Sequence, residues 1–290
     1  MTPDNCELIL KKLEAQRKEE GEISLLLEFY EKLIQIYSRV SRQISVSGRL
    51  DPQSLDPAIK QGLPLVSFAK VTVNWSLLPE VFSQVIAVFD HYPDLFGVIP
   101  KKWKLPGAGN TLTEETVREW LAEARLPSTL SARGASKALL PSVIQAAVKP
   151  FLSSLAQMYI DSIDPERWRR NYCPICGGVP DFAYLDRERG SRWLICSQCD
   201  TEWLFQRLQC PFCGTEDQKA LAYFTDDKGL YRLYICERCQ QYLKAIDLRQ
   251  TDGEVLLPLE RFYTLDLDQQ AQQRGYRHYI AGPGYRQRRQ

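Results

Sequence analysis

The chain has 290 residues, of which 44% are hydrophobic, and its 37 basic and 36 acidic side chains leave a formal net charge of +1. This length and composition can supply separate hydrophobic cores for two domains. The balanced charge gives no general attraction to nucleic acid or to anionic lipid, and no apolar run approaches the roughly 18 residues that a membrane span needs.

The first half of the chain is predicted to be helical. From Glu22 to Ile44, apolar residues recur at three- and four-residue steps, which indicates one buried helix face. Further helices are expected over 5–20, over 77–89, after Thr111 or Thr113 as far as Pro127, and over 137–163 with interruptions at Pro141 and Pro150. Residues 47–76 are rich in proline and glycine and are expected to run irregularly over these helices. Together these elements predict an all-helical domain over 1–165.

Eight of the nine cysteines lie in the second half of the chain and form four Cys-x-x-Cys pairs: Cys173 and Cys176, Cys196 and Cys199, Cys210 and Cys213, and Cys236 and Cys239. Two residues between thiolates let one tight turn present both sulfurs to one metal ion, so two pairs complete a tetrahedral site. The motif Cys173-Pro-Ile-Cys-Gly177 returns as Cys210-Pro-Phe-Cys-Gly214, and each copy is followed by two strand-like runs that end at another pair. The repeat predicts two metal sites, each made by consecutive pairs.

We call the two predicted groups the first cysteine set, which is Cys173, Cys176, Cys196 and Cys199, and the second cysteine set, which is Cys210, Cys213, Cys236 and Cys239. Each set with its hairpin has the pattern of a rubredoxin or zinc ribbon. We therefore expect an α+β protein in which the helical domain precedes two tandem rubredoxin-like modules, over 166–207 and 208–250. A strand over 242–246 and a helix over 258–273 are also expected, and residues 251–290 are predicted to be a C-terminal helix and a basic tail.

Disulfides and redox-active dithiols are weaker interpretations of the cysteines. The chain begins Met-Thr-Pro-Asp, without the basic and apolar regions of a signal peptide, so we expect it to stay in the reducing cytoplasm, where disulfides are rare. A thioredoxin-like dithiol would occur once, in a βαβ setting, whereas this motif occurs four times. A purely structural metal stays open. The spacing also does not separate iron from zinc, because both accept tetrahedral four-sulfur sites.

No catalytic residue and no further cofactor-binding residue is predicted. Both cysteine sets would be closed sites without an open coordination position, and His91 and His278 lie outside them in sequence. Electron transfer is compatible with a closed iron site, since four-thiolate iron can change oxidation state without losing a ligand. Tyr172, Trp193 and Trp203 flank the first cysteine set, either as docking anchors for a partner or as part of the module's own core.

Longer motifs surround the cysteine pairs. They are Tyr172-Cys-Pro-Ile-Cys-Gly-Gly-Val-Pro180 and Arg192-Trp-Leu-Ile-Cys-Ser-Gln-Cys-Asp-Thr-Glu-Trp203, with Tyr242-Leu-Lys244, Leu267-Asp268 and Gly275-Tyr276 further on. With these residues the chain resembles the formate dehydrogenase accessory protein family, FdhE. The similarity is strong over about 165–280 and weaker in the helical half.

The resemblance implies a cytoplasmic accessory protein for the maturation of formate dehydrogenase, which binds the immature catalytic subunit that carries the molybdopterin cofactor. It also implies that the eight cysteines hold two rubredoxin-type iron sites, with zinc as the alternative, and that the protein is not itself an enzyme. A nucleic-acid-binding zinc ribbon is the main alternative function. The charge argues against it, because 173–250 contains ten basic and eleven acidic residues, whereas nucleic-acid binders usually show a basic stripe.

Overall fold

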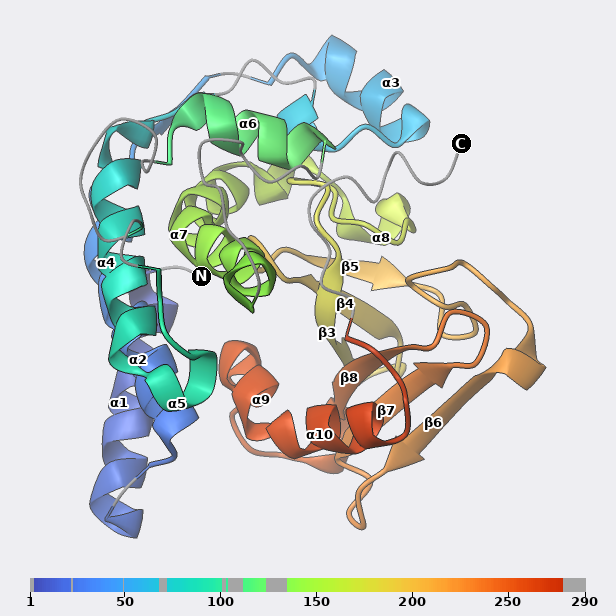
Figure 1. The fold of residues 1–290 in the computed structure, drawn as a ribbon. Coiled ribbons are helices and arrows are strands. Elements are labelled where there is room, and N and C mark those ends of the chain that lie inside the picture. Colours follow the sequence, from blue (N-terminus) through green and yellow to red (C-terminus); the bar gives the residue numbers. More distant parts are fainter. Residues whose placement is uncertain are drawn as a thin grey trace. The chain divides into compact units, whose positions relative to one another are not determined.

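The structure is a computed structural model and describes residues 3–21, 23–48, 50–67, 72–100, 103, 112–123 and 135–278 (Figure 1). These residues form two compact units. The first unit takes 3–48 and 72–158, and the second unit takes 50–67 and 159–278. The end of the helix expected to stop by Pro127, and the basic tail beyond 278, lie outside the described residues.

The first unit is built from helices, which the sequence predicted except for a four-residue helix over Pro93–Phe96. They are α1, Pro3–Glu20; α2, Leu25–Ser41; α4, Leu78–His91; α5, Pro93–Phe96; α6, Glu114–Glu123; and α7, Ala135–Tyr159; two short strands, β1, Val46–Ser47, and β2, Thr72–Val73, pair beside them. The hydroxyl oxygen of Ser24 accepts a bond from the Leu27 amide at 3.3 Å and so starts α2. Phe29 of α2 then meets Phe89 of α4 edge to face, with 4.9 Å between the ring centroids.

The helix α7 continues through Pro141 and Pro150, so the expected interruptions are absent. A proline removes one helix hydrogen bond, but apolar side chains near both prolines are buried, among them Ile144 and Phe151, and this packing holds the helix together. The stretch Leu139–Ser162 is long and apolar enough to cross a membrane by length and composition alone. Since 67% of its apolar window is buried in the protein, it also matches the core helix of a soluble protein.

Residues 50–67 form a helix and a docked turn, where the sequence predicted an irregular excursion over the first helices. The helix α3, Pro52–Gln61, ends at Gly62, which adopts a φ of +72°. The amide of Leu65 then donates to the carbonyl of Pro174 at 2.9 Å. This contact with the first Cys-x-x-Cys turn explains why the segment belongs to the second unit, and why the expected helical domain over 1–165 is not one continuous unit.

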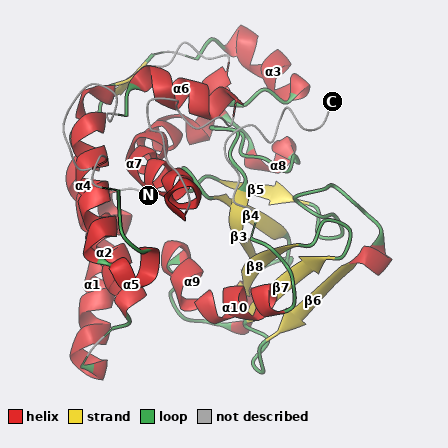
Figure 2. Ribbon diagram, in the orientation of Figure 1, coloured by secondary structure: helices red, strands yellow, loops and turns green. Residues whose placement is uncertain are grey.

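A six-stranded sheet forms the centre of the second unit (Figure 2). Its strands are β3, Pro180–Leu185; β4, Arg192–Cys196; β5, Glu202–Phe205; β6, Leu221–Thr225; β7, Tyr231–Cys236; and β8, Gln241–Asp247, in the spatial order β5-β4-β3-β8-β7-β6. All were predicted except β5. Neighbouring strands are antiparallel apart from β3 and β8, which pair in parallel with Phe182 opposite Lys244. The two tandem modules are present as expected, but this parallel pair joins them into one sheet.

The helix expected over 258–273 is divided into α9, Leu257–Tyr263, and α10, Leu265–Gln273. The two helices meet at Thr264, whose hydroxyl donates to the carbonyl of Glu260 at 2.7 Å, a bond that bends helices. The apolar face of α10 packs on β7 and β8 in a cluster of Leu233, Ile235, Tyr242, Leu267, Ala271 and Tyr276. Both helices lie beside this end of the sheet in Figure 2, so α+β is the fold class of the chain.

Candidate metal centres

The first and third cysteine pairs lie in turns of the same shape. The amides of Gly177 and Gly214 donate to the carbonyls of Cys173 and Cys210, at 3.0 Å in both turns. Both glycines adopt a positive φ, of 75° and 71°, a region that glycine enters at no steric cost because it lacks a Cβ atom. The repeat in the sequence is therefore a repeat in backbone structure.

The second and fourth pairs lie in related turns, whose left-handed residues were not predicted from the sequence. The amides of Asp200 and Gln240 donate to the carbonyls of Cys196 and Cys236 at 3.2 and 2.8 Å. Asp200 and Gln240 have φ values of 60° and 55°, although few residues other than glycine adopt this region. An aspartate or glutamine gives no clear sequence signal for a left-handed position, so this part of the site was missed.

The structure brings the four sulfur atoms of each cysteine set within 4.8 Å of one another. In the first cysteine set, the Sγ atoms of Cys173 and Cys199 are 3.5 Å apart, and that of Cys176 lies 3.4 Å from Cys196 and 3.5 Å from Cys199. A disulfide would require about 2.05 Å. Four sulfurs placed about 2.3 Å from a central ion are about 3.8 Å apart, so this set fits a tetrahedral metal ion.

The second cysteine set has the same arrangement but lies closer to solvent. The Sγ atoms of Cys210 and Cys239 are 3.7 Å apart, as are those of Cys213 and Cys236. All four cysteines of the first set are buried, whereas Cys213 and Cys239 of the second set are partly exposed. The two groups could each hold one ion, in consecutive sets as the spacing predicted, and the second ion would be the more accessible one.

Main-chain amides point toward the sulfurs. Ile175 and Phe212, at equivalent places in the two repeated motifs, donate to the Sγ atoms of Cys173 and Cys210 at 3.4 Å each. The Sγ atom of Cys199 also lies 3.0 Å from the hydroxyl oxygen of Thr201. Hydrogen bonds of this kind stabilise thiolate ligands and influence the properties of the metal that they hold.

Burial and mutual repulsion decide which charge state the cysteines can adopt. Burial raises the pKa of Cys176 and of Cys196 well above the ordinary thiol value. In the more open second set, the hydrogen bond with Cys239 lowers the pKa of Cys210 to about 5. Four thiolates at these distances repel one another, so a metal cation is needed to keep each set fully deprotonated.

The aromatic residues of the first module differ in their burial and contacts. Trp203 is fully buried and donates through its indole nitrogen to the carbonyl of Arg170 at 2.7 Å. The hydroxyl of Tyr172 donates to the carbonyl of Gly62 at 2.8 Å. These two residues therefore hold the second unit together. Trp193 is partly exposed and stacks on Tyr184, with the ring planes 5° apart.

A buried arginine beside the first cysteine set was not found from the sequence. Arg261 of α9 donates to the carbonyl of Cys196 at 2.9 Å, forms an ion pair with Asp181 at 3.0 Å, and pairs with Asp200. An arginine in a predicted amphipathic helix is ordinarily solvent-exposed, so its role depends on the tertiary fold. It places a positive charge next to one ligand turn of the first set.

The histidines lie outside both sets. His91 is the last residue of α4, and the ring of His278 lies against Tyr242 with 5.6 Å between centroids. Across the described parts of the chain, the groups of cysteine, histidine and carboxylate side chains that are close enough to share an ion are the two cysteine sets.

Comparisons with known proteins agree with this arrangement. A model of the FdhE central domain matches residues 172–207, which hold the first cysteine set. A curated FdhE homolog of Aquifex aeolicus is 26% identical over 275 residues, which is 93% of this chain and 92% of the relative. FdhE of Escherichia coli is 28% identical over 163 residues, or 54% of this chain and 51% of the relative.

A solved structure has the same fold. The crystal structure of the FdhE protein from Pseudomonas aeruginosa aligns with a TM-score of 0.56 and covers 96% of this chain and 92% of that protein. At 21% sequence identity, the likeness concerns the fold alone. It extends over both units, whereas the matched family model is confined to 172–207.

Proposed function

The chain belongs to the FdhE family, and on that basis we propose that it is a cytoplasmic accessory protein for the maturation of formate dehydrogenase. In this role it binds the immature catalytic subunit, which carries the molybdopterin cofactor, and does not itself catalyse a reaction. The helical unit and the cysteine-bearing unit both take part in binding. The nucleic-acid alternative is disfavoured by the balanced charge of the cysteine region.

One observation carries the proposal. Similarity to an FdhE homolog extends over 93% of the chain, and within that length all eight clustered cysteines fall into two closed four-sulfur sets. A catalytic metal keeps a coordination position open for substrate, whereas these sets supply four thiolates to each ion. The arrangement suits a binding protein better than a metal-dependent hydrolase or transferase.

Deletion of the gene in the native host, followed by capture of partners, tests the function. We expect formate dehydrogenase activity to be lost and then restored by the wild-type gene. Affinity capture of the tagged protein should recover the catalytic subunit of formate dehydrogenase. The Cys6→Ala variant, which changes the cysteine that belongs to neither set, should behave as wild type. Recovery of only RNA and ribosomal proteins would favour the nucleic-acid-binding alternative.

We further propose that the bound metal is iron, held by Cys173, Cys176, Cys196 and Cys199 in one site and by Cys210, Cys213, Cys236 and Cys239 in the other. Four-thiolate iron supplies one-electron chemistry without a change of ligands, and amides directed at the sulfurs favour the charged thiolates. Iron should give the isolated protein a red colour that fades with dithionite, with two ions per chain. A colourless protein with two zinc ions would contradict this proposal.

A redox role is a separate step. If electron transfer contributes to maturation, the catalytic subunit must bind or mature differently with ferric and with ferrous protein. Affinity and maturation rate should be measured in both states and after zinc substitution. Equal values in all three would show that the metals only stabilise the fold, and the accessory function would be unaffected.

A further inference from the structure

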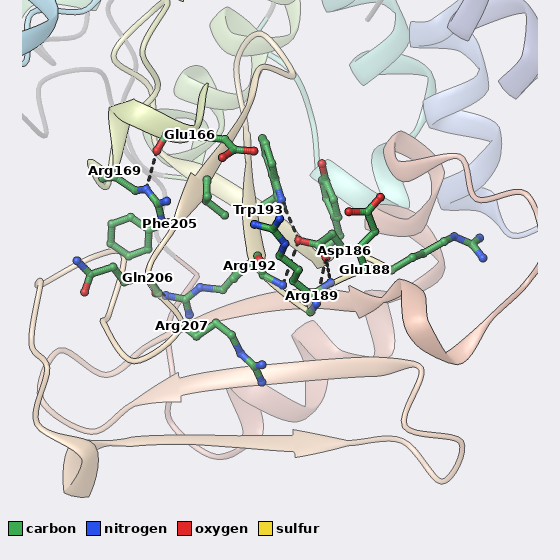
Figure 3. Close-up of a pocket in the computed structure, with 15 residues that line it drawn as sticks. Glu166, Arg169, Asp186, Glu188, Arg189, Arg192, Trp193, Phe205, Gln206 and Arg207 are labelled. Carbon is green, nitrogen blue, oxygen red and sulfur yellow. Dashed lines mark hydrogen bonds between the residues drawn. The ribbon is translucent and has the colours of Figure 1, made fainter. Parts of the chain in front are cut away.

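A cavity of about 700 Å³ opens in the second unit, and none of its lining residues is a cysteine (Figure 3). Its walls come from the turn between β3 and β4, from the segment after β5, and from the short helix α8, Pro165–Trp168. Five arginines line it: Arg169, Arg187, Arg189, Arg192 and Arg207. In Figure 3, Arg169 and Arg207 lie on one side of Trp193, with Asp186 and Glu188 on the other. We call this cavity the arginine pocket.

The carboxylates of the arginine pocket do not neutralise its arginines. Glu166, Asp186 and Glu188 line it, so the arginines exceed the acids by two. Asp186 accepts main-chain bonds from Arg189 at 2.7 Å and from Gly190 and Ser191 at 3.0 and 3.1 Å, and a bond from the Trp193 indole at 3.3 Å. Its carboxylate therefore stabilises the β3–β4 turn through these hydrogen bonds. None of the five arginines forms an ion pair with another residue in the described part of the chain.

Arg192 supplies a buried positive charge in the pocket wall. Its side chain is 2% exposed, and it donates to the main-chain oxygens of Gln206 and Gln209 but to no carboxylate of the described residues. Its Nε atom is buried without a hydrogen-bond partner. The guanidinium also lies over the rings of Phe205 and Tyr234 at 5.4 and 5.5 Å. No carboxylate of the described residues pairs with this buried cation, and the anionic group near it is Cys210 of the second cysteine set, which lines a small neighbouring pocket together with Arg192. A buried cation that is only partly compensated is costly, so an anion in the arginine pocket would stabilise it.

The internal repeat provides a comparison for Arg192. Arg192 precedes Trp193-Leu-Ile-Cys196 in β4, and Arg232 precedes the equivalent Leu233-Tyr-Ile-Cys236 in β7. Arg232 is also buried, but it pairs with Asp247 at 2.6 Å. The second module thus supplies a carboxylate for its buried arginine, whereas the first module opens a pocket beside it.

We propose that the arginine pocket binds the phosphate group of a small organic phosphate ester of about nucleotide size. Guanidinium groups recognise phosphate oxygens by paired hydrogen bonds. The excess of two positive charges matches the −1.5 to −2 or so that a phosphate monoester carries at neutral pH. The cavity is far larger than a phosphate ion and lies within the range of roughly 300–1,000 Å³ for small-molecule sites.

The organic part of the ligand would meet an aromatic wall. Trp193 lines the pocket and is held in place by its stacking on Tyr184 and by its bond to Asp186. Such a fixed indole suits a planar group attached to the phosphate. The proposal does not depend on the accessory function, because it is based on the charge and shape of this pocket alone.

Isothermal titration calorimetry of the full-length protein tests the proposal, with inorganic phosphate, pyrophosphate, AMP and GMP as probes. Salt should be about 0.15 M, where charges further apart than about 8 Å are screened. We expect at least one nucleoside monophosphate to bind more tightly than inorganic phosphate. The double variant Arg189→Ala with Arg207→Ala, which changes two exposed arginines, should weaken this binding by at least about tenfold.

A matched control removes the same charge elsewhere. Arg167→Ala with Lys228→Ala changes two exposed cations that do not line the pocket, and its affinity should equal that of wild type. Three results would overturn the proposal. They are no binding of any probe at millimolar concentration, equal loss in the control, and binding of a glutamate-rich peptide as tight as that of the nucleotides.

Discussion

Arg261 donates from Nη2 to the main-chain oxygen of Cys196 at 2.9 Å and so fastens the helix α9 to a ligand turn of the first cysteine set. The same guanidinium pairs with Asp181 of β3 and with Asp200, which follows the second Cys-x-x-Cys pair. It is 8% exposed. One buried cation therefore connects α9, β3 and the metal-binding turn, and it offsets part of the negative charge that four thiolates bring.

Replacing Arg261 should weaken the first site selectively. Arg261→Ala leaves Asp181 and Asp200 without their cation next to four thiolates, and breaking a buried pair in this way costs about 3–5 kcal/mol. We expect the metal content to fall from two ions to one per chain, measured by elemental analysis after dialysis. Arg274→Ala, which removes an exposed arginine near Phe224, should keep both ions. Retention of two ions in Arg261→Ala would show that the arginine is dispensable for the site.

Lys244 stabilises the packing of α9 and α10 on the sheet. Lys244 is 4% exposed, and its ammonium group donates to the carbonyls of Arg261 and Thr264, at 2.8 and 3.2 Å, and to Asp268 at 2.6 Å. The positive charge thus meets the C-terminal end of α9, where carbonyls lack partners within the helix. It is a buried charge in the centre of β8, and its partners come from a later part of the chain.

Lys244→Met should lower the free energy of unfolding by about 3–5 kcal/mol. The substitution removes the cation that pairs with the partly buried Asp268, which keeps the hydroxyl of Tyr242 as a donor, and it removes one donor from each of two carbonyls. Urea unfolding followed by circular dichroism measures the change. The double variant Lys244→Met with Asp268→Leu should recover part of the loss, since it removes the unpaired charge as well. The single variant Asp268→Leu should be measured as well. If the loss of stability in the double variant equals the sum of the losses in the two single variants, the two residues are not coupled.

Local patterns predicted much of this fold. The helices of the first unit followed from apolar periodicity, and the repeated spacing of the cysteines predicted which of them meet, because each hairpin closes a short loop. These features are decided by residues close together in sequence.

The features that were missed depend on long-range contacts. The parallel pairing of Phe182 with Lys244 joins two modules that each looked self-contained. The proline- and glycine-rich segment 50–67 gave no indication that Leu65 would bond to Pro174 in the distant first Cys-x-x-Cys turn. From the sequence, Arg261 would likewise be assigned to the protein surface, because its burial depends on the packing of α9 against the sheet. In each case the partner lies too far along the chain for a periodic or spacing argument to find it.

The order of strands predicts that the two cysteine sets support the sheet unequally. The strand β3 of the first module lies inside the sheet between β4 and β8, whereas β6 of the second module is an edge strand. Loss of the first site should therefore disturb both modules. Structural four-sulfur sites contribute roughly 10–16 kcal/mol of apparent binding free energy to folding. This is comparable with the whole net stability of an ordinary domain, which is about 5–15 kcal/mol.

We expect Cys173→Ser with Cys176→Ser to remove hydrogen-exchange protection from β3 to β8, while α2 and α4 of the first unit stay protected. Cys210→Ser with Cys213→Ser should remove protection from β6 and β7 but leave much of it in β3, β4 and β5. Hydrogen exchange followed by mass spectrometry measures both patterns, with Cys6→Ala as the control. Equal and complete loss in both double variants would contradict the predicted difference between the sets.

The last prediction concerns the turn that holds α3 against the first module. Gly62 adopts a φ of +72°, and a Cβ atom there would lie 2.5 Å from Nε of Arg170 and 2.6 Å from the Tyr172 hydroxyl. Both side chains are engaged with this turn, since Arg170 donates to the carbonyl of Lys60 and Tyr172 to that of Gly62, each at 2.8 Å. An added methyl group must displace them, so Gly62→Ala combines backbone strain with the loss of about two hydrogen bonds.

Gly229→Ala separates these two contributions. Gly229 has a similar φ, of +68°, but nothing lies within 4 Å of the position of its Cβ. Both variants therefore carry the backbone strain, and Gly62→Ala alone carries the crowding. We expect Gly62→Ala to be the less stable by about 1–2 kcal/mol in urea unfolding, with faster proteolysis in 50–67 than in the Gly229→Ala variant. Equal stability and equal proteolysis would mean that α3 does not depend on Arg170 and Tyr172 for its attachment to the second unit.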